Sequence, residues 1–233
     1  MDGGILWILA GTMFPFIMTT LGAGMVFFFR RTVGEGAQRI FLGFAAGVMV
    51  AASVWSLLIP AIEQAQEQGV PGWMPAAVGF VLGAGFLMLL DSVMPHLHPG
   101  ASTPEGAPSS FQRSSLLMIA VTLHNIPEGM AVGLSLALAA QQQDGNAWSA
   151  ALALALGIGI QNFPEGAAIS LPLRQEGISH WKAFGYGSLS GLVEPVFGLL
   201  VVLVASNVAP LMPYLLSFAA GAMLYVVVEE LIP

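Results

Sequence analysis

The chain is poor in charge and lacks cysteine: of its 233 residues, 8% are Asp, Glu, Lys or Arg and none is Cys. The absence of cysteine excludes a disulfide framework, a thiol nucleophile and a thiolate metal site. An ordinary soluble domain carries about 25% charged residues. So few charges cannot cover the surface of a soluble protein of this length, which excludes most cytosolic enzymes and disordered tails.

Basic residues are especially scarce. Six Lys and Arg stand against 13 Asp and Glu, and the formal net charge is −7. A nucleic-acid-binding protein needs a basic face, so we expect no nucleic-acid partner.

Apolar residues are abundant, at 56% of the chain, together with 28 Gly and 12 Met. This composition is typical of helical membrane proteins, in which glycine is more frequent than in soluble helices. The first four residues, Met-Asp-Gly-Gly, lack the basic start of a signal peptide, so we interpret the apolar run that follows as a retained transmembrane helix. The expected fold class is all-α, a polytopic helical membrane protein whose partner is the lipid bilayer.

Seven windows are long enough to cross a bilayer, which requires about 20 mostly apolar residues. We expect one transmembrane domain over residues 1–233 and a mobile cytoplasmic loop at about 96–113, which is rich in Pro, Ser and Gly. The expected spans are about 5–29, 40–62, 73–95, 115–139, 147–173, 183–206 and 211–232.

All the basic residues fall in the odd-numbered loops between these spans. They are Arg30, Arg31, Arg39, Arg113, Arg174 and Lys182. Because Lys and Arg accumulate in cytoplasmic loops, loops 1–2, 3–4 and 5–6 are predicted to be cytoplasmic and the N-terminus to lie outside.

Two internal repeats are visible. His124-Asn125-Ile126-Pro127-Glu128-Gly129 matches residues 161–166, Gln-Asn-Phe-Pro-Glu-Gly, and Phe-Ala-Ala-Gly at 44–47 followed by Leu-Ile-Pro at 58–60 matches residues 218–221 and 231–233. The second match predicts an inverted repeat of spans 1–3 and 6–8 around spans 4–5, as in many secondary transporters, with an eighth helix expected after Pro233. Chance similarity between Gly- and Ala-rich apolar helices is the alternative explanation.

Polar side chains inside three of the spans are the main functional candidates, because ionisable groups within a membrane are costly. At about 1.5 Å per residue, they all lie about 16–20 Å deep, near the middle of a hydrocarbon core about 30 Å thick. They are His124, Asn125 and Glu128 in the fourth span, Gln161, Asn162 and Glu165 in the fifth, and Glu194 in the sixth.

The spacing of these groups places them on one helix face, since residues three or four apart are neighbours. Pro127 and Pro164 leave the carbonyl groups of Leu123 and Ile160 without a helix hydrogen bond. A membrane helix tolerates such free backbone groups only where they face protein, water or an ion. One imidazole, several amides and three carboxylates suit a divalent cation, and two bridging carboxylates would give a binuclear site. The alternative is a proton relay or a set of helix–helix hydrogen bonds.

Further polar positions mark a candidate path to and from this site. Solvation at the membrane interface or in an ordinary loop is the alternative explanation for most of them. They are Ser56, Glu63, Asp91, His96, His98, Glu229 and Glu230.

The two Pro-Glu-Gly motifs, the Gly-Leu-Val-Glu-Pro of the sixth span, and the Pro-His-Leu-His at 95–98 resemble the ZIP (Zrt/Irt-like) metal transporters, in their bacterial GufA-like branch. The resemblance covers nearly the whole chain. It implies an eight-helix fold in a bacterial plasma (inner) membrane, often dimeric, that moves divalent metal into the cytoplasm. It also implies an elevator in which spans 1, 4, 5 and 6 slide against spans 2, 3, 7 and 8. The cargo would be Zn²⁺, with Cd²⁺, Fe²⁺ and Mn²⁺ as further substrates.

The resemblance also assigns ligands, residue by residue. One ion would use His124, Glu128, Gln161 and Glu165, and the other Asn125, Glu128, Asn162, Glu165 and Glu194. Gln161 stands where many members have His, and Asn162 where some have Asp, which leaves the first site poorer in nitrogen and the second poorer in charge.

Three other functions fit parts of the pattern. A proton-coupled exporter and a metal-gated channel share buried carboxylates. An intramembrane metalloenzyme would need a metal-activated water with a general base, as in the HExxH motif, which the chain lacks. We therefore expect neither enzymatic activity nor a catalytic cofactor.

Overall fold

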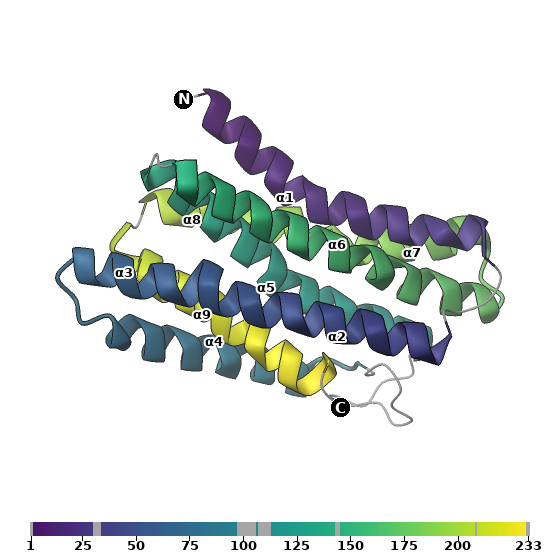
Figure 1. Ribbon diagram of the computed structural model, residues 1–233. Helices are drawn as coiled ribbons and strands as arrows, with labels where there is room; N and C mark the ends of the chain where they lie inside the picture. Colours follow the sequence, from purple (N-terminus) through teal and green to yellow (C-terminus); the bar gives the residue numbers. More distant parts are fainter. Residues whose placement is uncertain are drawn as a thin grey trace.

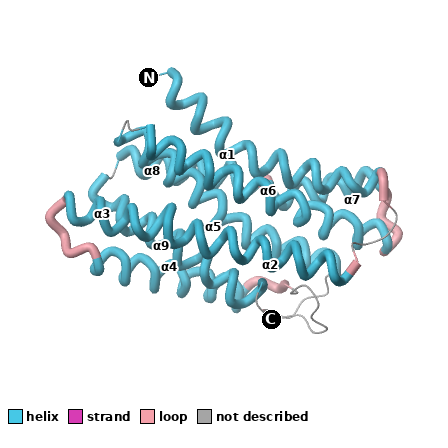
Figure 2. The backbone as a smooth tube through the Cα atoms, viewed as in Figure 1, coloured by secondary structure: helices cyan, strands magenta, loops and turns pink. Residues whose placement is uncertain are grey.

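The computed structural model describes residues 2–29, 34–96, 106, 113–142, 145–207 and 209–231. Throughout these residues the regular structure is helical and contains no strand (Figure 2), which confirms the all-α prediction. Most of the predicted mobile loop, at 97–105 and 107–112, lies outside the described residues. The α-helices are α1 (Asp2–Ala23), α2 (Glu35–Ala51), α3 (Ile59–Glu67), α4 (Trp73–Val93), α5 (Arg113–Gln142), α6 (Gly145–Gln175), α7 (His180–Gly191), α8 (Val193–Asn207) and α9 (Met212–Val226).

Short irregular turns extend several of these helices. They are the 3₁₀ turns η1 (Gly24–Phe27) and η3 (Ala209–Leu211), and the π-helical turns η2 (Ala52–Leu58) and η4 (Val227–Leu231). The turn η2 precedes Pro60, which has no backbone N–H and crowds the carbonyl four residues earlier. The second predicted span is thus α2, η2 and α3 in series, with a local widening that the sequence prediction did not include.

Six of the described helical segments are long and apolar enough to cross a bilayer. They correspond to the first, second, third, fifth, sixth and seventh predicted spans. Helix α5 has 30 residues, covers the fourth predicted span and holds His124, Asn125 and Glu128. The chain is therefore a multi-pass helical membrane protein by length and composition.

The sixth predicted span is broken in two. Helix α7 ends at Gly191 and α8 begins at Val193, with Leu192 between them. Pro195 explains the break, because its ring crowds the carbonyl of Gly191 and it has no N–H to donate. Glu194 consequently lies in the first turn of a new helix rather than in the middle of a continuous one.

The helices form two groups (Figure 1). Helix α1 packs along α6 and α7, and α5 packs along α8, whereas α9 packs against α4, α3 and η2. The two groups meet where α5 contacts α9 and α2 contacts α6. The main apolar core lies across this boundary, with fully buried Leu134, Leu136, Ile158, Leu216 and Met223.

Glycines set the closest crossings inside each group. In the second group, a Cβ on Gly83 would collide with the carbonyl of Phe218, and one on Gly221 would collide with that of Phe80. In the first group, Gly129 approaches the backbone of Glu194, and Gly166 that of Thr19. Small residues let membrane helices approach closely, so the glycine of each Pro-Glu-Gly motif is a packing residue.

Candidate metal centre

Three helices of the first group carry the predicted ligands. His124, Asn125 and Glu128 lie on α5, and Gln161, Asn162 and Glu165 lie on α6, each set within little more than one helical turn. The close approach of Gly129 to Glu194 brings the first turn of α8 alongside the α5 motif. The local sequence therefore sets the spacing along each helix, and glycine crossings set the distance between helices.

The two repeats touch through one short hydrogen bond. Gln161 Nε2 donates to Glu128 Oε1 over 2.6 Å, and both side chains are 1% exposed. This contact confirms that the α5 and α6 motifs lie at the same depth in the bundle.

The third carboxylate, on Glu194, is fully buried and accepts a hydrogen bond from the Thr19 hydroxyl of α1 over 3.3 Å. The carboxyl groups of Glu128, Glu165 and Glu194 are close enough to interact electrostatically in all three pairings. Three acidic side chains this close together repel one another when ionised, and a cation placed among them relieves that repulsion.

The remaining predicted ligands surround these carboxylates. His124 interacts electrostatically with Glu165, and the Asn162 side chain interacts with both Glu128 and Glu194. Asn125 donates from Nδ2 to the carbonyl oxygen of Ser190 over 3.1 Å, which ties α5 to α7 near the helix break. The structure thus brings all seven residues into one region.

Free buried oxygen atoms concentrate in this layer. Among the described residues, ten buried side-chain nitrogen or oxygen atoms have no hydrogen-bond partner. Six of them are oxygens of predicted ligands: Asn125 Oδ1, Glu128 Oε2, Gln161 Oε1, Asn162 Oδ1, Glu165 Oε2 and Glu194 Oε2. Buried polar atoms are nearly always satisfied, so this cluster has the donor chemistry that a hard or borderline divalent cation requires.

The acidic and imidazole side chains alone do not form a ready metal cage. Within the described part of the chain, no group of three or more His, Cys, Asp or Glu is arranged to hold a metal ion. Amide oxygens from Asn and Gln would have to complete any coordination sphere, which agrees with the partnerless amide oxygens above.

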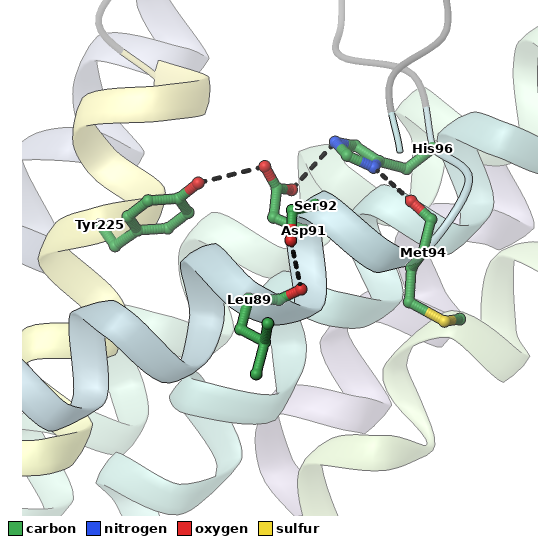
Figure 3. Close-up of polar contacts among 6 residues, drawn as sticks. All are labelled: Leu89, Asp91, Ser92, Met94, His96 and Tyr225. Carbon is green, nitrogen blue, oxygen red and sulfur yellow. Dashed lines mark hydrogen bonds and ion pairs between the residues drawn. The ribbon is translucent and has the colours of Figure 1, made fainter. Parts of the chain in front are cut away.

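The residues predicted to line a path to the site differ from the seven predicted ligands in their contacts. His96 was expected in a mobile, solvated loop, and this prediction is wrong: the side chain is fully buried. Its Nε2 lies 2.9 Å from Asp91 Oδ1, its Nδ1 lies 2.8 Å from the carbonyl oxygen of Met94, and Tyr225 donates to Asp91 Oδ2 over 3.1 Å (Figure 3). Ion pairing and hydrogen bonds at both ring nitrogens stabilise the buried imidazole, so Asp91 and His96 link the end of α4 to α9.

The other path residues differ in their burial. Ser56 is partly buried in η2, while Glu63 on α3 and Glu229 on η4 are exposed, as interfacial residues are. His98 lies outside the described residues, and so does the side chain of Glu230.

Sequence reasoning missed four contributors to this site. Thr19 gave no signal, because one Thr in an apolar span is common. The sequence shows Gly129 and Gly166 only as the repeated last residue of Pro-Glu-Gly and does not show their close approach to other helices. Ser190 contributes a backbone carbonyl, which no side-chain pattern reveals.

Comparisons with known proteins agree with the motif pattern. The model of a family described as ZIP zinc transporters matches residues 105–233. The chain is 39% identical to a protein named zinc transporter ZIP11 from Xenopus tropicalis, over 98% of this chain and 89% of that protein. It is 39% identical to zinc transporter GufA of Myxococcus xanthus, over 84% and 76%, and to zinc transporter ZIPB of Bordetella bronchiseptica, over 94% and 69%.

Proposed function

The chain belongs to the ZIP zinc transporter family, and from that premise we propose that it carries Zn²⁺ through the polar layer between α5, α6 and α8. The observation that carries this proposal is the set of six partnerless buried oxygens on the predicted ligands. Cd²⁺, Fe²⁺ and Mn²⁺ are further substrates in this proposal, because carboxylate and amide oxygens accept them as well.

Two ions share the layer in this proposal. His124, Glu128, Gln161 and Glu165 hold the first, and Asn125, Glu128, Asn162, Glu165 and Glu194 hold the second. The electrostatic contacts of Glu128 and Glu165 with each other and of both with Glu194 support a bridging role for the first two carboxylates.

The transport movement is an elevator within one transmembrane domain. The helices around the site pack closely at glycines: Gly129 of α5 contacts α8, and Gly166 of α6 contacts α1. In the other group, Gly83 of α4 and Gly221 of α9 bring these two helices together. Between the two groups the contact of α5 with α9 is largely apolar. Such a boundary lets one group slide against the other without breaking buried hydrogen bonds.

The charge pattern supports the topology of this proposal, with loops 1–2, 3–4 and 5–6 in the cytoplasm. From the resemblance to the ZIP family we further propose that the protein brings metal inward across a bacterial inner membrane, as a homodimer. Flux of Zn²⁺ into proteoliposomes, measured with the gradient in both directions and with and without a proton gradient, tests this. Zn²⁺ import that does not depend on a proton gradient supports the proposal. Zn²⁺ movement out of the cytoplasmic side that occurs only when a proton gradient is imposed contradicts it and favours an exporter.

A further inference from the structure

Thr19 is a hydroxyl from α1 that reaches into the polar layer. Its side chain is fully buried, and its Oγ1 lies 3.3 Å from Glu194 Oε1 and 3.2 Å from the carbonyl oxygen of Pro15. A hydroxyl has one proton to donate, so the two acceptors share it. The hydrogen bond joins residues that are 175 positions apart in the chain.

The packing around Thr19 holds this hydroxyl in place. A Cβ on Gly191 would lie 2.9 Å from Thr19 Cβ and 3.0 Å from its Oγ1, and a Cβ on Gly166 would collide with the Thr19 carbonyl. Two glycines on α7 and α6 therefore make room for α1 to approach. At this distance the side chain is confined beside the start of α8, where Glu194 lies.

The hydrogen bond makes the two oxygens of Glu194 unequal. Oε1 accepts from Thr19, whereas Oε2 has no hydrogen-bond partner among the described residues. A carboxylate with one oxygen engaged in this way presents the other to a cation and binds it through a single atom.

We propose that Thr19 is a positioning residue that sets metal selectivity by restricting Glu194 to one metal-facing oxygen. This inference rests on the proposed function, because it requires Glu194 to contact the transported ion. Zn²⁺ is satisfied by about four close ligands. Larger cations take more oxygens and often both oxygens of one carboxylate, as Ca²⁺ does with about six to eight. Holding Oε1 in a hydrogen bond therefore disfavours a larger ion such as Cd²⁺ relative to Zn²⁺.

The chain offers a matched control on the same helix. Thr12 is also buried, at 1% exposed, and its hydroxyl donates to the backbone carbonyls of Ile8 and Leu9. It packs against α8 as well, since a Cβ on Gly198 would lie 2.9 Å from Thr12 Cγ2. Thr12 shares the burial and packing of Thr19, but its hydroxyl donates to backbone carbonyls rather than to a carboxylate.

The test compares Thr19→Val and Thr19→Ala, which remove the hydroxyl with different volumes, with Thr19→Ser, which keeps it, and with Thr12→Val. Titration calorimetry of Zn²⁺ and Cd²⁺ on the purified protein gives the binding preference, and competition uptake into proteoliposomes gives the transport preference. We expect the preference for Cd²⁺ over Zn²⁺ to rise roughly tenfold in both hydroxyl-free variants. Removing the hydrogen-bond partner of a metal ligand typically changes metal affinity by about 10- to 100-fold, and this is the low end of that range. Thr19→Ser and Thr12→Val should keep the parent preference.

Three results would overturn the inference: an unchanged preference in Thr19→Val and Thr19→Ala, an equal shift in Thr19→Ser, or an equal shift in Thr12→Val. Because the two hydroxyl-free variants differ in volume, a folding defect in one leaves the other to decide. Glu128→Ala in the same series separates the two proposals. If Glu128→Ala binds and transports metal like the parent, the proposed site fails. If it loses both while the Thr19 variants keep the parent preference, the Thr19 inference alone fails.

Discussion

Gln161 Nε2 donates a hydrogen bond to Glu128 Oε1 over 2.6 Å, linking the first position of one repeated motif to the carboxylate of the other. Gln161 Oε1 and Glu128 Oε2 are buried and have no hydrogen-bond partner among the described residues. One amide oxygen and one carboxylate oxygen are therefore available to a cation, and the amide nitrogen holds the carboxylate in position.

Replacing Glu128 by Ala should nearly abolish metal transport while the protein remains in the membrane. This carboxylate interacts with both Glu165 and Glu194, so its loss removes a ligand from each proposed ion. Zn²⁺ flux in proteoliposomes measures the effect. Glu67→Ala, which removes an exposed carboxylate at the end of α3, is the matched control and should retain flux. Parent-like flux in Glu128→Ala would refute the bridging assignment.

Asn162→Asp should tighten metal binding at the second proposed ion. The Asn162 side chain interacts with Glu128 and Glu194, so a carboxylate there adds a charged ligand in a low-dielectric site. One added charge contact of this kind is expected to tighten binding by about tenfold, or about 1.4 kcal/mol.

The metal-free Asn162→Asp protein should also melt at a lower temperature, because a fourth acidic group joins the cluster, and Zn²⁺ should raise its melting temperature more than that of the parent. Isothermal titration with parallel melting curves checks both effects. Unchanged or weaker binding would argue against Asn162 as a ligand.

Gln161→His should shift selectivity toward Zn²⁺ or Cd²⁺ and away from Mn²⁺. Imidazole nitrogen suits the softer ions, whereas Mn²⁺ is satisfied by oxygen, and the new side chain stays on the helix face that carries Glu165. Competition uptake of Zn²⁺ against Mn²⁺ at fixed pH measures the shift. Gln161→Glu, which keeps an oxygen at this position, serves as the comparison. A preference that stays constant or moves toward Mn²⁺ in Gln161→His would mean that Gln161 does not contact the ion.

Gly129→Ala should destabilise the protein because its Cβ would overlap the backbone of Glu194. Overpacking of this kind costs about 1–3 kcal/mol, and relief requires α8 to move away from α5, which also displaces a proposed ligand. Thermal unfolding in detergent measures the loss. Gly47→Ala is the control, since a Cβ on Gly47 has nothing within 4 Å, and its stability should stay equal or rise slightly. Equal melting temperatures for the two variants would contradict the close α5–α8 crossing.

Tyr225→Phe should lower stability by about 1 kcal/mol, because it removes the hydroxyl that donates to Asp91. His96→Ala should cost more, since it leaves Asp91 without its ion-pair partner. Tyr214→Phe on the same helix, whose hydroxyl has no hydrogen bond among the described residues, is the control for losing a phenol. We expect the melting temperature to fall in the order Tyr214→Phe, Tyr225→Phe, His96→Ala. The reverse order would exclude this link between α4 and α9.

Much of the architecture was already readable in local patterns. The scarcity of charge and the apolar runs indicate a membrane protein because each depends only on composition and on about 20 consecutive residues. The paired motifs at 124–129 and 161–166 placed the proposed ligands correctly on α5 and α6. Helical spacing is a local property, so it survives folding unchanged.

The limits of local reasoning are equally specific. His96 looked like a loop residue because it lies next to a segment rich in Pro, Ser and Gly, yet it is buried against Asp91. The other carboxylate oxygen of Asp91 accepts a hydrogen bond from Tyr225, which comes from the far end of the chain. The break at Leu192 was implied by Pro195 but was hidden by the continuous apolar character of the span.

What the sequence alone determined about this protein is its class, most of its helical segments and the identity of the polar residues that meet between α5, α6 and α8. Only the tertiary structure decided which oxygens of those residues are engaged. Thr19 donates to Glu194 Oε1 and Gln161 donates to Glu128 Oε1, while one oxygen of each carboxylate has no hydrogen-bond partner among the described residues. The physical reason is that hydrogen bonds between helices depend on crossing distances. Glycine contacts such as Gly129 on Glu194 and Gly191 on Thr19 set those distances between segments far apart in the chain.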